Sequence, residues 1–174
     1  MADIIVIREL DAAEAARRLG ELGVILRDAV ESGASVNFLQ GFTQDEAEAF
    51  WRGQLAGLAE GGRQLLVADD GDKLVGTVVL TLAPQPNQPH RADIGKMLVL
   101  SSHRRRGLGR RLLDAVETLA RAQGRTLLML DTTLGSSGDR LYRSCGWVEY
   151  GIVPGHALST LGVPTATAFF YKEV

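Results

Sequence analysis

The 174-residue chain has one cysteine, Cys145, and only three histidines. A single cysteine excludes an intramolecular disulfide framework and any cysteine-rich zinc site. The histidines, at positions 90, 103 and 156, show no metal-ligand spacing such as His-x-x-x-His. The sequence therefore predicts a protein that binds no metal.

Long apolar runs and an excess of one charge are also missing. No stretch approaches the ~18 apolar residues that span a bilayer, and Met1–Ile7 has neither a basic segment nor a small-residue cleavage site. The 19 Lys and Arg nearly balance the 21 Asp and Glu, for a net charge of −2, which argues against disorder and against a protein-wide field for nucleic acid. These absences predict a soluble, cytoplasmic protein with no membrane or nucleic-acid partner.

The apolar residues that are present suffice for one good-sized core. They make up 45% of the chain, and its length fits one domain over residues 1–174 because domains usually run about 100–200 residues. The hydrophobic periods predict an α/β protein with a mixed sheet of six to seven strands and about four helices. The expected helices cover residues 11–26, 43–58, 107–123 and 139–145; the expected strands cover 3–9, 64–68, 73–82, 91–100, 126–130, 147–153 and 165–172.

Local signals support several of these elements. Thr43 and Glu46 form a capping-box pattern at a helix start, and Gly71 supplies the positive φ that a hairpin turn requires. Gly124 stands at the expected end of the third helix. The continuous apolar run from Thr126 to Leu130 is typical of a strand covered on both faces.

The stretch from Met97 to Arg111 carries the strongest functional signal. Gly107 and Gly109 remove Cβ atoms where the backbone would approach another group closely. The helix that starts there has about four amide N–H groups without intrahelical partners and the positive end of the helix dipole. Five arginines surround this point, at positions 104, 105, 106, 110 and 111. Because arginine is unfavourable at a helix N-terminus, the cluster favours a bound polyanion such as a pyrophosphate over a merely solvated turn.

Two common phosphate loops are excluded at this place. No lysine follows the glycines as in a Walker loop, and Leu112 stands where a dinucleotide fingerprint has its third glycine. The pattern Arg104-x-x-Gly107-x-Gly109 instead resembles motif A of the GNAT superfamily of acetyl-CoA-dependent N-acetyltransferases. The segment Asp139–Trp147, with its tyrosine followed by a Gly-aromatic pair, is similar to the second signature of that superfamily.

This resemblance implies a GNAT fold with a central pair of splayed parallel strands, and acetyl-CoA as co-substrate. It further implies that strand backbone pairs with the pantetheine arm and that loop amides hold the pyrophosphate. The cofactor-binding residues so implied are Met97, Leu98, Val99, Arg104, Arg105, Arg106, Gly107, Leu108, Gly109 and Arg110. Many members carry Asn where this chain has Gly135, and Ser136 and Ser137 are the candidate substitutes.

Catalytic roles follow from the same resemblance. Tyr142 would protonate the departing thiolate, and a phenol with a pKa near 10 suits that step; a plain core tyrosine is the alternative. Asp93 and Asp131 are both candidates for the base. Asp93 lies six residues before Val99, on the strand where many members place a glutamate, and Asp131 ends an apolar strand. For either aspartate a cap or turn role is the alternative.

The segments His90–Val99 and Leu130–Ser136, with the C-terminal Pro-Thr-Ala run, are similar to the tabtoxin-resistance enzymes of this superfamily. That similarity implies direct acetyl transfer to an amino acid or an amino-acid-like antibiotic or toxin. An inactive acyl-CoA-binding or regulatory module is the alternative, and nucleic-acid binding through the arginines is a weaker one. By analogy, the strand Ala166–Tyr171 is expected to pair with a second copy in a homodimer.

Overall fold

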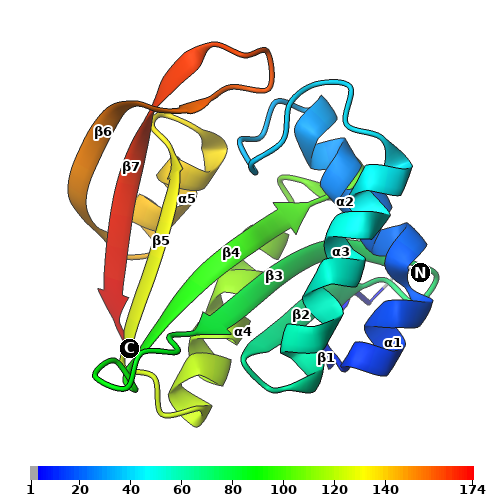
Figure 1. Ribbon diagram of the computed structural model, residues 1–174, viewed down its shortest axis with the longest axis horizontal. Helices are drawn as coiled ribbons and strands as arrows, with labels where there is room; N and C mark the ends of the chain where they lie inside the picture. The colour runs from blue at the N-terminus through cyan, green and yellow to red at the C-terminus, as the bar shows by residue number, and fades with distance from the viewer. Residues whose placement is uncertain (1–3) are drawn as a thin grey trace.

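The structure, a computed structural model, describes residues 4–174 and is built on a seven-stranded mixed sheet. The strands lie in the order β1-β2-β3-β4-β5-β7-β6, with α2 and α3 in front of the sheet and α4 behind it (Figure 1). The strands are β1 (Val6–Leu10), β2 (Arg63–Asp69), β3 (Leu74–Leu82), β4 (Arg91–Val99), β5 (Leu127–Thr133), β6 (Val148–Leu158) and β7 (Pro164–Glu173). The helices are α1 (Ala12–Arg17), α2 (Leu19–Glu31), α3 (Gln44–Ala59), α4 (Leu108–Ala122) and α5 (Ser137–Ser144), with a short 3₁₀ turn at Ser101–His103. The predicted mixed α/β class is confirmed.

Several local signals are confirmed where the sequence placed them. Thr43 and Glu46 form the predicted capping box at the start of α3, and Gly71 has φ 97° in the β2–β3 turn. Gly124 has φ 69° just after the end of α4. The expected strand at 3–9 begins at residue 3, outside the described residues, and β1 begins at Val6.

The single helix expected over residues 11–26 is wrong. The chain leaves helical geometry at Arg18, whose φ is −108° and ψ 16°, so α1 and α2 are separate and residues 4–174 hold five α-helices instead of four. The bend lets α2 turn its own apolar stripe toward the sheet. The buried residues of that stripe are Leu22, Gly23, Ile25, Leu26, Ala29 and Val30.

Strand β5 differs from its prediction in its length and in how many of its faces are buried. Its ladder with β7 continues to Thr133, paired with Thr167, so Asp131 lies within the strand and does not end it. Leu128 and Leu130 are buried, whereas Asp131 is exposed. Within residues 4–174, α5 is the helix that packs on β5, and it covers the face of Leu128 and Leu130 while the face of Asp131 stays open.

The sheet order excludes edge-to-edge pairing of Ala166–Tyr171 with a second copy, and the homodimer itself stays a prediction. Strand β7 lies between β5 and β6 and is hydrogen-bonded along both edges. A strand whose two edges are occupied cannot add a further strand. The outer strand on this side of the sheet is β6.

The predicted splayed parallel pair is confirmed in β4 and β5. Their ladder joins Arg91–Asp93 to Leu127–Met129 and then stops, although both strands run on. Figure 1 shows the two strands opening in a V from this base. The backbone edges that face each other above Asp93 and Met129 are therefore available to a ligand.

Candidate active site

The N-terminus of α4 lies after the turn that leaves β4 and carries no side-chain cap. Gly107, at its N-cap, has φ 75° and ψ 3°, and the first turn of the helix contains no acidic residue. Arg105 also has a positive φ, 62°. The free amides at the start of α4 therefore form a cationic concavity of the kind that binds phosphate groups.

The two glycines of this turn serve different purposes. A Cβ on Gly107 would meet nothing within 4 Å, so this position needs glycine for its left-handed backbone. A Cβ on Gly109 would lie 3.1 Å from Cδ2 of Leu141 on α5. Among the protein's own atoms, the close contact is thus at Gly109, where two helices meet, and the predicted approach of the loop to a bound anion stays a prediction.

The arginines predicted to surround the turn divide into two groups. The Arg104 guanidinium donates to the Val99 carbonyl at 3.0 Å and lies 3.7 Å from Asp28 on α2. Asp28 also accepts from the backbone amide of Ser101 at 2.8 Å. These contacts fix the loop between β4 and α4 against α2.

The remaining arginines point elsewhere. Arg110 donates to the Ser144 hydroxyl at 3.2 Å, and Arg111 donates to the Ile5 carbonyl at 2.6 Å. Arg105 and Arg106 are exposed, and within residues 4–174 their side chains make no hydrogen bond or ion pair. Of the five arginines, these two have side chains free to bind an anion.

Strand β4 contains a bulge beside the V. Gly95 pairs with Val79 and Leu98 pairs with Thr77, so Lys96 and Met97 together oppose a single residue of β3. Lys96 has φ 47°, and its carbonyl accepts a 2.7 Å hydrogen bond from the Thr77 hydroxyl. A bulge of this kind re-aims a side chain and is common next to active sites.

Tyr142 lies on α5, behind the sheet. It is buried, with its ring centroid 6.0 Å from that of Trp147 and 6.1 Å from that of Phe170. Burial raises the pKa of Tyr142 above its usual value, and the negative charge of Asp131 adds to the effect. No hydrogen-bond partner for its hydroxyl occurs among residues 4–174. The phenol is thus held in its protonated form with its proton uncommitted.

Helix α5 is positioned by its first turn. Ser136 caps the helix by accepting from the Asp139 amide at 3.1 Å, and the buried Asp139 carboxylate accepts from the Gly135 amide at 2.7 Å. Gly135 has φ 76°, a conformation that suits glycine. Ser136 is therefore used as a cap, and Gly135 as a turn.

The two candidate carboxylates lie on the opposite face of the sheet from Tyr142. The Thr132 hydroxyl is 3.2 Å from that of Ser136, at the start of α5, so the neighbouring Asp131 points away from α5. Asp93 is in register with Met129, two residues before Asp131, and shares its face. Burial raises the pKa of the Asp93 carboxyl, its Arg91 partner at 2.8 Å opposes the shift, and the Asp131 charge adds to it.

Lys96 is a site residue that the sequence reasoning missed. Its ammonium lies 5.1 Å from the centroid of the Phe50 ring on α3. Burial lowers the pKa of Lys96, and Asp131 acts in the opposite direction. The available signal was a lysine inside an otherwise apolar strand segment, which costs free energy unless it has a use.

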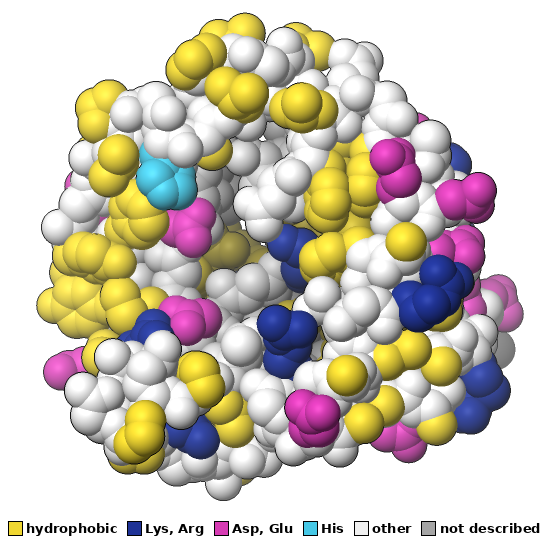
Figure 2. All heavy atoms as spheres, in the orientation of Figure 1, with side chains coloured by type: hydrophobic (Ala, Val, Ile, Leu, Met, Phe, Trp, Pro, Cys, Tyr) yellow, Lys and Arg dark blue, Asp and Glu magenta, His cyan; other side chains and the backbone are white. Residues whose placement is uncertain are grey.

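The carboxylate face is framed by two loops. The backbone N–H of Gln40, in the loop between α2 and α3, donates a 2.7 Å hydrogen bond to the backbone carbonyl of Thr160, in the loop between β6 and β7. Figure 2 shows a hollow near the centre of this face, with acidic and basic side chains around it. The bridge between the loops therefore limits the opening to the site.

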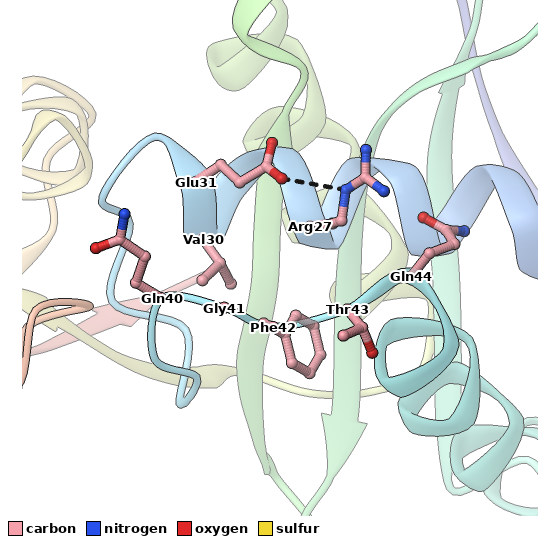
Figure 3. A pocket seen from close by; sticks show the side chains of 8 residues that line it. All are labelled: Arg27, Val30, Glu31, Gln40, Gly41, Phe42, Thr43 and Gln44. Atoms are coloured by element: carbon pink, nitrogen blue, oxygen red, sulfur yellow. Dashed lines mark ion pairs between the residues drawn. The ribbon is translucent and has the colours of Figure 1, made fainter.

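A pocket of about 530 Å³ lies beside the same loop, between it and the end of α2 (Figure 3). An ion pair of 3.3 Å between Arg27 and Glu31 crosses one side of it. Its Phe42 stacks on Phe38, which contacts Phe50 edge-on at 5.5 Å between ring centroids. The pocket and the Lys96 site thus share an aromatic wall.

Among residues 4–174 there is no group of three His, Cys, Asp or Glu side chains arranged to hold a metal ion. None of the helices in this range combines the length and apolar character needed to cross a membrane.

The chain belongs to the acetyltransferase (GNAT) family, whose family model matches residues 27–147. Human N-acetyltransferase 8 is 34% identical over 96 residues, which make up 54% of this chain and 42% of that protein. The rat protein of the same name is 33% identical over 96 residues and is covered to 43%. The match thus spans less than half the length of these relatives.

Solved structures share the fold over nearly the whole chain. An N-acetyltransferase from Staphylococcus aureus superposes with a TM-score of 0.79 at 17% identity, covering 98% of each chain. A ribosomal-protein-alanine N-acetyltransferase from Brucella melitensis gives 0.76 at 24%, covering 97% of this chain and 99% of that one. A candidate acetyltransferase from Salmonella typhimurium, solved with its cofactor acetyl-CoA, gives 0.75 at 20%, covering 98% and 94%.

Proposed function

We propose that this protein transfers an acetyl group from acetyl-CoA to the amine of a small molecule, by direct attack without an acyl-enzyme. The observation that carries the proposal is the V-shaped gap between β4 and β5. The uncapped N-terminus of α4 lies beyond the end of β4. Tyr142 lies behind the gap, and the carboxylates of Asp93 and Asp131 lie in front of it. Acetyl-CoA, when bound, supplies the thioester. All other steps are assigned to side chains and backbone of this chain.

The binding residues fit a long phosphorylated thioester. The amides around Gly107 to Arg110, with the free guanidinium groups of Arg105 and Arg106, match a pyrophosphate. The backbone of Met97 to Val99 lies where β4 no longer pairs with β5, so it can hydrogen-bond an extended pantetheine arm as a strand would. Arg104 positions this loop through Val99 and Asp28.

Asp131 is the carboxylate we assign as base. It is exposed in front of the V, and within residues 4–174 it has no ion-pair partner, whereas Asp93 is held by Arg91 at 2.8 Å. A free carboxylate can take a proton from the incoming ammonium, directly or through one water. Asp93 shares this face and adds negative charge that attracts a cationic amine.

Tyr142 is assigned as the acid. Its ring is buried behind the sheet, and burial raises the pKa of its phenol, so the hydroxyl is protonated at neutral pH. A proton donor there can neutralise the thiolate as it leaves, while the amine enters from the front.

For the acceptor we propose an amino acid or an amino-acid-like antibiotic or toxin. The support is the similarity of residues 65–174 to the tabtoxin-resistance enzymes, together with the restricted opening between the two loops. A small acceptor fits that opening better than a folded protein does.

The test is release of free thiol from acetyl-CoA in the presence of amino acids, polyamines, aminoglycosides and peptide N-termini. Turnover with one class of small amine is expected. Tight CoA binding with no thiol release from any of these amines would identify an acyl-CoA-binding module and overturn the proposal.

A further inference from the structure

Lys96 is a partly buried cation without an anionic partner. Lys172, the other partly buried lysine, is held by Glu117 at 2.8 Å. In the part of the chain that is described, Lys96 makes no ion pair, and its ammonium lies 5.1 Å from the centroid of the Phe50 ring. A desolvated ammonium costs free energy unless a counter-charge arrives with a ligand.

The bulge in β4 directs this side chain to the acceptor face. In an uninterrupted strand, Asp93 and Lys96 would point to opposite faces because they are three residues apart. The additional residue at Lys96–Met97 changes that alternation. Lys96 consequently reaches α3 in front of the sheet, on the face that Asp93 and Asp131 share.

Lys96 and Asp131 then frame the front of the V with opposite charges that do not meet. The two charges influence one another, since Asp131 favours the charged form of Lys96. No ion pair joins them in the structure of residues 4–174. Space between two unpaired, opposite charges suits a ligand that carries both charges itself.

We propose that Lys96 binds a carboxylate of the acceptor while Asp131 faces the acceptor's amine, so that the site selects amines bearing a nearby anionic group. The inference rests on the proposed function and names the substrate class for it. Lys96 acts here as a specificity residue: it holds the acceptor and takes no part in bond making.

The acceptor's charge is the variable to test. Replacing a carboxylate with a neutral carboxamide leaves the ammonium unpaired, and charged hydrogen bonds are worth about 10- to 100-fold in affinity. Acetyl transfer is measured for the free acids of the common amino acids and for the matching carboxamides. Wild-type protein is expected to show a kcat/KM at least about 10-fold higher for the acid of each accepted pair.

The variants are Lys96→Met and, as a matched control, Lys73→Met at an exposed lysine of the β2–β3 turn. Lys96→Met is expected to remove the preference for the acid mainly by raising the KM for the acid. Lys73→Met is expected to match the wild type. Equal kcat/KM for acid and carboxamide in the wild type, or an undiminished preference in Lys96→Met, would overturn the role of Lys96 while acetyl transfer itself stands.

A binding measurement separates this inference from the proposed function. N-acetylated amino acids and their carboxamides are titrated into the CoA complex of each protein. Binding of the acid in preference to the amide, lost in Lys96→Met, supports the carboxylate site even if no amine is turned over. Binding without that preference contradicts it whether or not acetyl transfer is observed.

Discussion

Asp131 and Tyr142 divide the proposed chemistry between the two faces of the splayed strand pair. Alternation along β5 sends Asp131 to the open face, and α5 brings Tyr142 to the covered one. Their environments differ accordingly: the carboxylate is exposed, and the phenol is buried among aromatic rings. Strand β5 thus presents the base and helix α5 the acid to the two ends of a single transfer.

Tyr142→Phe should reduce kcat by roughly 100-fold or more, because general-acid catalysis contributes about that much. The ring packing against Trp147 and Phe170 is kept, so the melting temperature and the CoA affinity should not change. Thiol-release kinetics and calorimetry measure these quantities, with Tyr150→Phe on exposed β6 as the matched control. A kcat equal to that of the control would remove Tyr142 from the mechanism.

Asp131→Asn should lower kcat more than Asp93→Asn, because Asp93 is engaged with Arg91 and Asp131 is free. A loss of at least about 10-fold is expected for Asp131→Asn at neutral pH. Since the loss comes from a missing base, it should shrink as rising pH deprotonates the amine in solution. A larger loss in Asp93→Asn would assign the base to that residue instead.

The turn before α4 depends on the left-handed backbone conformation of Gly107. Gly124, at the other end of the helix, has the same conformation and provides a matched control. Gly107 and Gly124 flank the same helix, with φ 75° and 69° and open space at both Cβ positions. Alanine at either position should destabilise the fold by about 1 kcal/mol, the cost of a left-handed backbone. Gly107→Ala alone should weaken CoA binding, by at least about 10-fold, because it displaces the amides that face the phosphates.

Calorimetric titration of the two variants decides this point. Gly124→Ala controls for the shared cost in stability. Equal CoA affinities in the two variants would show that the turn at Gly107 has no part in binding.

At the other end of the sheet, Arg8 ties β1 to α1 and β2. Its guanidinium binds Glu14 at 2.6 and 3.0 Å and Asp69 at 2.8 Å. The hydrogen bond from Arg8 lowers the pKa of Glu14 below its usual 4.5. The native state therefore binds the proton less tightly than the unfolded chain, so the stabilisation is complete above pH 4.5 and is lost as the pH falls through the native pKa.

Arg8→Met should accordingly lower the free energy of unfolding by about 0.5–1 kcal/mol at pH 7, since the pair is partly exposed. The difference from wild type should narrow at pH 3. Urea denaturation at both pH values measures it, with Arg52→Met on the exposed side of α3 as control. A difference of the same size at pH 3 would mean that the ion pair is not its source.

Much of the architecture could be predicted from the sequence because it depends on local patterns. The capping box at Thr43 and the glycine after α4 fix helix ends, and the leucine-rich stripe of α4 has one possible orientation. The break at Arg18 and the extension of β5 to Thr133 could not be predicted, since packing and ladder partners set them. The interior position of β7 is likewise a property of strand order.

The site was predicted in part for the same reason. The cluster of Arg104 to Gly109 and the tyrosine motif are contiguous in sequence, so their placement near one strand pair could be anticipated. Lys96 could not be found this way, because its orientation depends on a bulge defined by β3. Nor does the sequence show that the Arg104 guanidinium forms an ion pair with Asp28, which lies on α2.

In the molecule as a whole, the V between β4 and β5 joins the phosphate turn to the catalytic faces. Its two strands part because β5 pairs with β7 and β4 pairs with β3, so each is held from its outer side. The gap is thereby built into the sheet order, and a ligand can fill it as a strand without unfolding either arm. Both the phosphate turn and the V should contribute to binding of the same molecule.

Titration calorimetry of the unmodified protein with CoA and with ADP separates these two contributions. The ADP used is the 3′-phosphorylated form, which keeps all the phosphates of CoA and lacks only the pantetheine arm, so it should bind at least about 10-fold more weakly than CoA if the V holds that arm. Binding of one CoA per chain with this margin is the expected result. No heat from CoA, or equal affinities for CoA and ADP, would contradict the role assigned to the splayed strands.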